Sequence, residues 1–391
     1  MVEFVCDNQE IEDLLIKMHD LVTSNGGFVH EDLSICARGS NLTIEAPASV
    51  AAGDRLITVP KQLLLPSEKF DLRLDGDDIC MGSPDGSLTS LQVTLMEQML
   101  GLYNLTGKMA AHRQTSTSRL FLEDREFFDR VALPTICKRH ESIPLKDFDL
   151  HTFMGTRHLG IKMNKADDVR TPSIMPIIDF FNNNSRSLGF NVDDNAVSID
   201  MSAPIEGSNE CFVRYGKYDA YSLLFGYDYV DPSVLFVASI PMTIELSGFG
   251  TLEIARNTSQ ERRREAPKTL SDLKSILPPI VPYPDENEVW LSYLIVPPPH
   301  MPRAMRRILA FAIELLSPSI SRFDRNFYLN DAERQIIEGN LKFYSDLKGY
   351  IGSYECKPGL EAIVENVGRV ADMQLEKIGN YSFDAAKKRS V

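Results

Sequence analysis

Two strand-rich stretches of the sequence are separated by a long helical stretch, and this order limits the folds open to the chain. The first strand-rich stretch runs from Leu42 to Val59 and is closed by Pro60, which lacks the donor that a sheet interior needs. Residues 61–165 then carry apolar side chains at helical spacing. Strand character returns over residues 172–215. We therefore expect a β-rich domain that carries a helical insertion.

Local signals predict several individual elements. Residues 9–24 place apolar side chains on one side and are followed by Gly26-Gly27, which predicts a helix that ends there. Residues 145–163 predict a further helix, and the apolar run Ile174–Ile178 predicts a strand. The polar turn Asp193–Asn195 lies between two apolar segments and predicts a hairpin.

A basic run at Arg262–Arg264 and a proline-rich segment at 278–282 predict a domain boundary. We expect an α+β chain in which residues 1–255 form the β-rich domain, with its helical insertion at about 61–170. Residues 256–391 are expected to form an all-α domain.

The C-terminal region predicts three successive helices. Residues 303–316 carry apolar side chains on one face. Asn330, followed three residues later by Glu333, predicts the N-terminal cap of the next helix. A last helix is expected to begin near Gly359.

The charge balance restricts the partners of the chain. Lys and Arg total 41 against 55 Asp and Glu, so the net charge is −14. A nucleic-acid-binding protein usually presents a basic surface, and we therefore expect no nucleic-acid partner. An acidic surface attracts a cationic partner, such as a segment that bears lysine, although solubility alone also explains it.

Other features of the composition indicate the compartment. No apolar run reaches the ~18 residues that a membrane-spanning helix needs, so no membrane partner is expected. The N-terminus does not resemble a secretory signal. The six cysteines are scattered without a CxxC pair, which argues against structural zinc and favours a reducing environment. We expect an intracellular, cytoplasmic protein; a monomer is favoured, without the oligomeric state being fixed.

Several short segments, in this order along the chain, resemble the SET-domain protein methyltransferases. The branch concerned contains the Rubisco large-subunit lysine methyltransferase and the actin-histidine methyltransferase. The matching segments are Val50–Leu64, Thr156-Arg157, Asp179–Asn183, Tyr215-Gly216 and Phe225–Tyr227. No single motif is specific, but their order and spacing together are. The resemblance spans nearly the whole chain.

The resemblance implies a protein-lysine N-methyltransferase that uses S-adenosylmethionine (SAM) and acts on a protein carrying the acceptor lysine. SAM and substrate would enter from opposite faces. The residue roles it implies are Tyr215 as the catalytic residue; Ser40, Asn41, Leu42, Arg157, Asp179, Asn182, Asn183 and Tyr215 in cofactor binding; and Phe181, Phe225 and Tyr227 in substrate binding. No metal site is expected.

This chemistry explains why such residues would be needed. The amine must arrive neutral, whereas a free lysine has a pKa of ~10.4, so deprotonation at neutral pH costs about 4–5 kcal/mol. A narrow apolar channel offsets part of this cost because it disfavours the charged form. Proximity and alignment can contribute roughly 7–11 kcal/mol. The Tyr215 phenol would align the amine, and Arg157 could bind the carboxylate of SAM through two parallel hydrogen bonds.

Two segments depart from the family pattern, and both belong to the expected cofactor site. Asn183 occupies the place of a family histidine, and Ser40–Thr43 replaces a glycine-containing turn that lies against the cofactor. A second reading therefore stays open, in which a catalytically lapsed SET-domain protein acts as a protein-binding module. A non-protein substrate, histidine as the acceptor and the degree of methylation also stay open.

Each candidate residue also has a purely structural reading. Tyrosine at the end of a strand is usually a packed, half-buried ring. Arginine on a helix is usually a solvated charge, and asparagine-rich segments such as Asn182–Asn184 make good turns. Aromatic residues such as Phe181 and Phe225 are, taken singly, more often part of a core.

Overall fold

The computed structural model describes residues 2–163, 169–255, 264–265, 267–274, 276–297, 301 and 303–387. The chain divides into two compact units. Unit 1 consists of Met1–Gly216 and Phe225–Ser233, and unit 2 of Lys217–Leu224 and Val234–Val391. The domain boundary predicted after residue 255 therefore falls inside unit 2. Residues 256–263, next to that boundary, lie outside the described residues.

The strands of unit 1 form small sheets that connect distant parts of the chain. They are β1 (Glu3–Cys6), β2 (Phe28–Val29), β3 (Ser34–Arg38), β4 (Asn41–Glu45), β5 (Arg55–Pro60), β6 (Leu65–Pro66), β7 (Leu72–Asp75), β8 (Asp78–Met81), β9 (Leu159–Ile161), β10 (Thr171–Ile174), β11 (Asn182–Asn183), β12 (Asn191–Val192), β13 (Ala196–Asp200) and β14 (Phe212–Val213). Their orders are β1-β3-β4, β12-β13-β5-β2 and β6-β10-β9, with the pairs β7-β8 and β11-β14.

Strand β5 precedes the helical insertion and pairs with β13, which follows it. Ile57 lies opposite Ile199 in this antiparallel register, and both side chains are buried. The expected β-rich region interrupted by helices is therefore confirmed. The hairpin between β12 and β13 is also confirmed, and the Asp193 carboxylate accepts hydrogen bonds from the backbone amides of Asn195 and Ala196 at 2.7 and 2.8 Å.

The helices of unit 1 match the sequence pattern at residues 9–24, but those of the insertion begin later than predicted. They are α1 (Gln9–Ser24), α2 (Ser90–Leu105), α3 (Lys108–Thr115), α4 (Ser118–Glu123), α5 (Arg125–Val131), α6 (Pro134–Glu141) and α7 (Phe148–Gly155), with the 3-10 helices η1 (Lys61–Leu63), η2 (Ser67–Lys69), η3 (Leu145–Asp147) and η4 (Ile178–Phe180). The prediction for residues 9–24 is confirmed. The insertion starts with the strands β6 to β8, and the helix predicted over 145–163 ends at Gly155, because Leu159–Ile161 pairs with β10.

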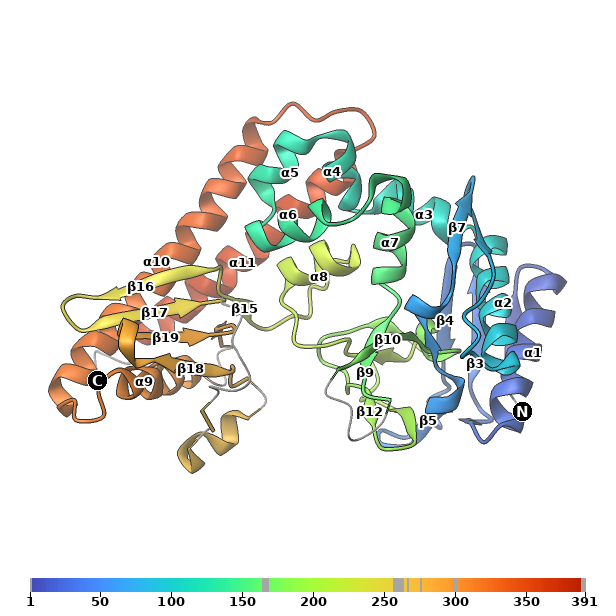
Figure 1. Cartoon of the computed structure of the whole chain (residues 1–391), viewed down its shortest axis with the longest axis horizontal. Coiled ribbons are helices and arrows are strands. Elements are labelled where there is room, and N and C mark those ends of the chain that lie inside the picture. The colour runs from blue at the N-terminus through green and yellow to red at the C-terminus, as the bar shows by residue number, and fades with distance from the viewer. Residues whose placement is uncertain are drawn as a thin grey trace. The chain divides into compact units, whose positions relative to one another are not determined.

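Helices α1 and α2 pack closely against each other (Figure 1). The contact is tight at Gly101, where an added Cβ would lie 3.1 Å from Leu14 Cδ1. The buried face of α1, with Leu15 and Met18, joins the core that also contains the strands β3 to β5. A glycine in a helix interior lowers helix propensity, but here it permits the close approach.

The strand predicted over Ile174–Ile178 is wrong in its second half. Strand β10 ends at Ile174, and Ile177 has φ 63° and ψ −45°, a rare conformation for a β-branched residue. The Ile178 amide donates to the Pro176 carbonyl at 2.7 Å, which closes a γ-turn around Ile177. The apolar run is buried as predicted, but the chain turns within it and enters η4, which carries Asp179.

Unit 2 combines a sheet with long helices. Its strands are β15 (Val237–Ala238), β16 (Met242–Leu246), β17 (Gly250–Ile254), β18 (Ile280–Tyr283), β19 (Glu288–Leu291) and β20 (Ile295–Val296), and its helices are η5 (Lys268–Leu273), η6 (Pro284–Glu286), α9 (Ala304–Leu316), α10 (Arg322–Ser353) and α11 (Glu361–Lys387). Helix α8 (Ala220–Tyr227) begins in unit 2 and ends in unit 1. The sheet order is β16-β17-β19-β18, and β15 pairs with β20.

The α+β class and the C-terminal helices are confirmed, but the region after residue 256 is not purely helical. Segment 278–282, interpreted from its prolines as a boundary, contains most of strand β18. This strand lies at one end of the sheet order, where a proline such as Pro282 is tolerated because one side of the strand needs no ladder donors. Among the described residues, no helix is long and apolar enough to span a membrane.

Helix α10 begins at a different cap from the one predicted. Its N-cap is Ser321, whose hydroxyl accepts a hydrogen bond from the Asp324 amide at 3.0 Å. Asn330 lies within the helix, and its side chain accepts a hydrogen bond from Arg306 at 3.0 Å. The pattern Asn330–Glu333 therefore resembles a cap but serves contacts between helices.

We predict that Ser321→Ala lowers the free energy of unfolding by about 1 kcal/mol, because one amide of the first turn of α10 loses its partner. Urea denaturation followed by circular dichroism measures the change. Ser353→Ala, at the opposite end of the same helix, is the matched control and should have little effect, since the Ser353 hydroxyl only adds a bond to the Tyr350 carbonyl. Equal stability of the Ser321→Ala variant and the unaltered protein would contradict the assignment.

Candidate functional site

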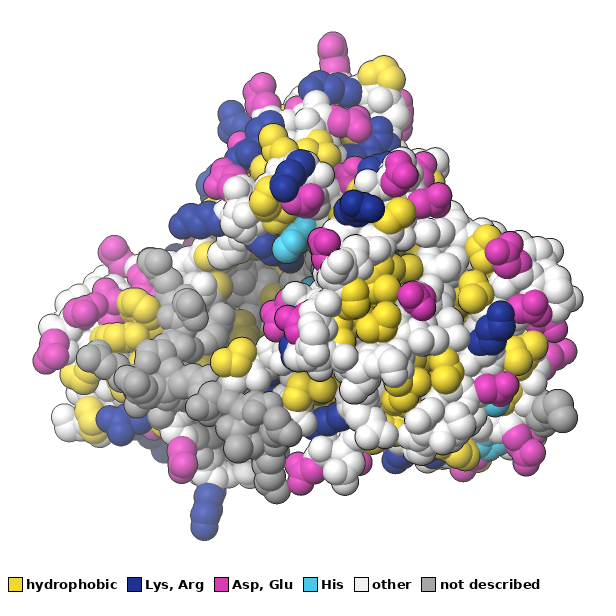
Figure 2. Space-filling model, turned by 45° about the vertical axis from the view of Figure 1, so that its right-hand side comes forward, with side chains coloured by type: hydrophobic (Ala, Val, Ile, Leu, Met, Phe, Trp, Pro, Cys, Tyr) yellow, Lys and Arg dark blue, Asp and Glu magenta, His cyan; other side chains and the backbone are white. Residues whose placement is uncertain are grey.

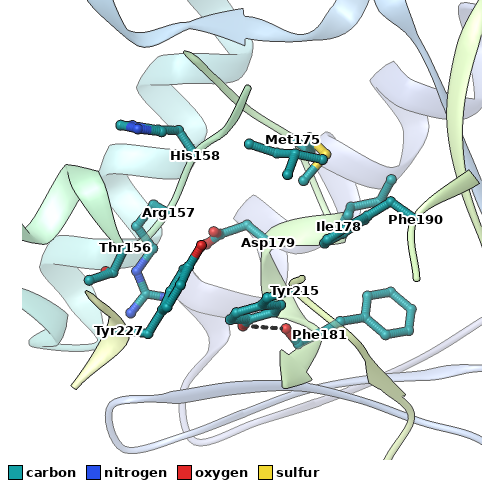
Figure 3. Close-up of a pocket in the computed structure, with 11 residues that line it drawn as sticks. Thr156, Arg157, His158, Met175, Ile178, Asp179, Phe181, Phe190, Tyr215 and Tyr227 are labelled. Carbon is teal, nitrogen blue, oxygen red and sulfur yellow. Dashed lines mark hydrogen bonds and ion pairs between the residues drawn. The ribbon is translucent and has the colours of Figure 1, made fainter. Parts of the chain in front are cut away.

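Two cavities in unit 1 share one wall. The larger has a volume of about 350 Å³ and is lined by Ser40, Asn41, Lys108, Ala111, His112, Thr115, Thr156, Arg157, Asn182, Asn183, Tyr215, Tyr227, Asp228 and Tyr229. The smaller, of about 30 Å³, is lined by Thr156, Arg157, His158, Leu159, Met175, Ile178, Asp179, Phe181, Phe190, Tyr215 and Tyr227 (Figure 3). The shared wall consists of Thr156, Arg157, Tyr215 and Tyr227.

Tyr215 is held in this wall by both its backbone and its ring. Its hydroxyl donates a hydrogen bond to the Phe181 carbonyl at 2.7 Å (Figure 3). The centre of its ring lies 6.4 Å from the centre of the Phe190 ring, on which it stacks, and 5.2 Å from the centre of the Tyr227 ring. Burial raises the pKa of the phenol above its ordinary value, so the hydroxyl stays protonated at neutral pH. A phenol that donates to a carbonyl still offers its oxygen as an acceptor on the cavity side.

Asn183 fixes the loop that precedes Tyr215. Strands β11 and β14 run parallel, with Asn183 opposite Val213. The Asn183 side-chain oxygen accepts a hydrogen bond from the Tyr215 amide at 3.0 Å, and its nitrogen donates to Asp231 at 3.1 Å. Asp231 also accepts from the amide and hydroxyl of Ser185. Asn183 is thus buried, and the oxygen and the nitrogen of its side chain both hold the shape of the site.

Arg157 faces a buried carboxylate. It follows α7, and its guanidinium lies 3.7 Å from the Asp179 carboxylate and 5.2 Å from the centre of the Phe153 ring. Tyr103 donates its hydroxyl to the same carboxylate at 2.8 Å. Burial raises the pKa of Asp179, and the nearby Arg157 opposes that shift. Nε of Arg157 is buried without a hydrogen-bond partner in the described structure, so the guanidinium has donor capacity left for a ligand.

Helix α3 contributes a second cation that sequence reasoning missed. Lys108 lines the larger cavity, where burial and the positive charge of Arg157 lower its pKa to about 7, against the opposing effect of Asp179. Gly107, with φ 62°, separates α2 from α3 and makes Lys108 the first residue of the second helix. The sequence showed only a glycine after a helix, and no periodic signal marks Lys108 as part of a site.

His112 and Asp228 line the same cavity and were also missed. The His112 ring lies 3.2 Å from the Thr152 hydroxyl through Nε2 and 3.5 Å from the Asp228 carboxylate through Nδ1. Burial lowers the pKa of His112 to about 3, so the imidazole is neutral. Asp228 has φ 57° and accepts hydrogen bonds from the amide and hydroxyl of Thr117 at 2.7 and 2.9 Å. Its left-handed backbone is the kind of local feature that composition does not reveal.

Most of the sequence-predicted residues line one cavity or the other. Of these residues, the larger cavity is lined by Ser40, Asn41, Arg157, Asn182, Asn183, Tyr215 and Tyr227. The smaller is lined by Arg157, Asp179, Phe181, Tyr215 and Tyr227. Asn182 is exposed and donates to Glu210 at 2.7 Å. The residues therefore lie around one continuous wall, although they come from distant parts of the sequence.

The side chains of Leu42 and Phe225 lie outside both cavities. Leu42 follows Asn41 on strand β4, and successive side chains of a strand point to opposite faces, so Leu42 enters the core with 2% of its surface exposed. Phe225 is 3% exposed, and the centre of its ring lies 6.3 Å from the centre of the Phe128 ring. The Phe225 carbonyl accepts a hydrogen bond from Arg139 at 2.8 Å. Their side chains thus serve packing.

Two further expectations concern metals and charge. Within the described ranges, no group of three or more His, Cys, Asp or Glu side chains is placed to hold a metal ion. All six cysteines are free. Figure 2 shows acidic and basic side chains intermingled over the face in view, without a continuous basic surface among the described residues of that face.

Comparisons with known proteins give matches among solved structures. No family model matches the chain, and no curated protein does. Among solved structures, the chain is similar to the SET domain of LSMT, which was solved with lysine and AdoHcy bound. The sequence identity is 11%, the match covers 97% of this chain and 93% of the other, and the TM-score is 0.42.

We predict that Asn183→Ala destabilises unit 1 by about 2 kcal/mol, because the buried Tyr215 amide and Asp231 both lose a partner. Asn182→Ala is the matched control: this neighbour is exposed, and its single bond to Glu210 should contribute little. Thermal unfolding of both variants measures the difference. If the two variants melt at the same temperature, Asn183 does not hold the loop.

Proposed function

We propose that the protein is a SAM-dependent protein-lysine N-methyltransferase. The observation that carries the proposal is the pair of cavities that meet at Tyr215 and Arg157: one is polar and large enough for a cofactor, the other narrow and mostly apolar. Methyl transfer needs this division, because donor and amine must meet across a short gap while each is held separately. The ordered motifs that resemble SET-domain methyltransferases support the same reading.

The larger cavity suits SAM. Its volume of about 350 Å³ falls within the range of small-molecule sites. Arg157 has a free, buried Nε and would bind the carboxylate of the methionine part. Ser40, Asn41 and Asn182 offer polar groups to the adenosine part. When bound, SAM supplies an electrophilic methyl group on a sulfonium.

The smaller cavity has the walls that a lysine side chain would need. Phe181, Phe190, Met175 and Ile178 make these walls apolar, and its volume of about 30 Å³ holds only about one or two waters, so the walls must part to admit the side chain. Such walls disfavour the ammonium and so favour the neutral amine that attacks. The Tyr215 oxygen, fixed by its bond to the Phe181 carbonyl, would align that amine. The amine nitrogen bonds to the methyl carbon, the carbon–sulfur pair of electrons stays on sulfur, and the extra proton leaves to water.

The acidic character of the chain supports a cationic protein substrate. With a net charge of −14, the surface favours the approach of a segment that contains lysine. Six free cysteines fit a reducing, cytoplasmic setting, and we propose a monomer there.

Two departures from the family pattern favour a second function, a catalytically lapsed protein that binds a partner. Asn183 stands where the family has histidine, and the segment Ser40–Thr43 lacks the glycines of the family turn. Asn183 still holds the Tyr215 amide, which counts against loss of the site. The two functions differ in whether SAM binds, so cofactor binding separates them.

We predict that the protein binds SAM and its product S-adenosylhomocysteine, as measured by isothermal titration calorimetry. Arg157→Met should weaken both by about tenfold or more, because a charge-assisted pair to the carboxylate is lost. Arg130→Met, which removes an exposed arginine of α5, is the control and should bind normally. Absence of binding at millimolar SAM would defeat the enzyme reading in favour of the partner-binding one.

We further predict that Tyr215→Phe lowers methyl transfer by about 100-fold, because the amine loses its aligning oxygen. Binding of S-adenosylhomocysteine and the melting temperature should stay close to those of the unaltered protein. Transfer of radiolabelled methyl to a matched proteome, followed by mass spectrometry, measures the activity and identifies lysine as the acceptor. Tyr328→Phe on α10 is the control. Undiminished transfer by Tyr215→Phe removes this tyrosine from its role, and label found only on histidine would replace lysine as the acceptor.

A further inference from the structure

We propose that Lys108 is a second anchor for the cofactor carboxylate, beside Arg157, and that it couples cofactor binding to the uptake of a proton. This proposal rests on the proposed function and adds a binding residue to it. The first observation is position: Lys108 and Arg157 line the same 350 Å³ cavity, although they come from the start of α3 and from the segment after α7.

The second observation is an imbalance of charge around this pair. Asp179 is the carboxylate that lies within 4 Å of Arg157, and it is already bonded to the Tyr103 hydroxyl. No ion pair or hydrogen bond of the Lys108 ammonium is found among the described residues. A ligand that brings one carboxylate would therefore give the two cations a shared counter-charge.

The remaining groups around Lys108 do not replace that counter-charge. His112, on the same helix, is neutral because burial lowers its pKa to about 3. Asp228 lines the same cavity, but burial raises the pKa of its carboxyl, against the hydrogen bonds from the amide and hydroxyl of Thr117, and so disfavours its charged form. Burial raises the pKa of the Tyr215 phenol, which is uncharged at neutral pH.

The charge of Lys108 determines how the affinity for a carboxylate ligand changes with pH. Burial and Arg157 lower the pKa of Lys108 to about 7, so near neutral pH a large share of the free protein carries an uncharged amine. A carboxylate binds the ammonium form and raises its pKa, so binding above pH 7 takes up a proton. Affinity should thus be constant well below pH 7 and fall as the pH rises above it, by up to about tenfold per unit.

The test compares two ligands on four proteins by calorimetry at about pH 6.5 and about pH 8.5, values on either side of the Lys108 pKa. The ligands are S-adenosylhomocysteine and methylthioadenosine, which lacks the amino-acid part. The unaltered protein should lose about tenfold in affinity for S-adenosylhomocysteine at the higher pH. It should also take up about half a proton per ligand near pH 7.5, read from two buffers of different ionisation enthalpy, because a tenfold effect on affinity corresponds to a rise of about one unit in the Lys108 pKa. Methylthioadenosine should show neither effect.

Lys108→Met should bind S-adenosylhomocysteine about tenfold more weakly at the lower pH and lose the pH dependence. Lys108→Arg should restore tight binding and stay independent of pH, because arginine remains charged. The melting temperature of Lys108→Met should not fall, since Lys108 is only partly buried and no ion pair or hydrogen bond of its ammonium among the described residues is lost. Lys146→Met, which removes a lysine whose side chain is 83% exposed, is the matched control and should behave like the unaltered protein.

Two results would overturn the role of Lys108 while leaving the proposed function intact. One is unchanged affinity of Lys108→Met for S-adenosylhomocysteine at the lower pH. The other is an equal loss of affinity for methylthioadenosine, which would show a general change in the cavity. If the unaltered protein binds neither ligand, the proposed function fails, and the role of Lys108 fails with it.

Discussion

The candidate site depends on one buried interaction, the pairing of Arg157 with Asp179. The carboxylate is held by the Tyr103 hydroxyl and by the turn at Ile177, and the guanidinium lies over the Phe153 ring. Neither charge is stable alone in such surroundings, because an unpaired buried charge is expensive. The pair therefore fixes the wall that both cavities share. Beside this pair, Lys108 adds a second basic group on the side of the larger cavity.

How far the fold could be predicted depended on whether the signals were local. Helix α1 and the hairpin at Asp193 were predicted closely, because apolar periodicity and turn chemistry decide such elements nearby in the sequence. Strand β18 was missed because its prolines suggested a break, and their tolerance at the end of a sheet follows only from the order of the strands. Asn330 failed as a cap for a similar reason: its partner, Arg306, belongs to another helix.

The residues of the candidate site also differ in whether the sequence could reveal them. Arg157, Asn183 and Tyr215 could be singled out because a family resemblance supplied their order, and the structure lines one cavity with all three. Lys108 and Asp228 belong to no motif, and packing of distant segments brings them to that cavity. Leu42 was included by sequence position alone, whereas strand alternation sends its side chain into the core.

Strand β18 has a consequence for how the chain behaves in crowded solution. A terminal strand normally exposes a row of amide donors to which a strand from another molecule can add, and this addition is a common start of aggregation. Pro282 removes one of those donors from the middle of β18, so an incoming strand would meet a gap in the ladder. The proline that obscured the strand in the sequence is thus suited to protect it from intermolecular pairing.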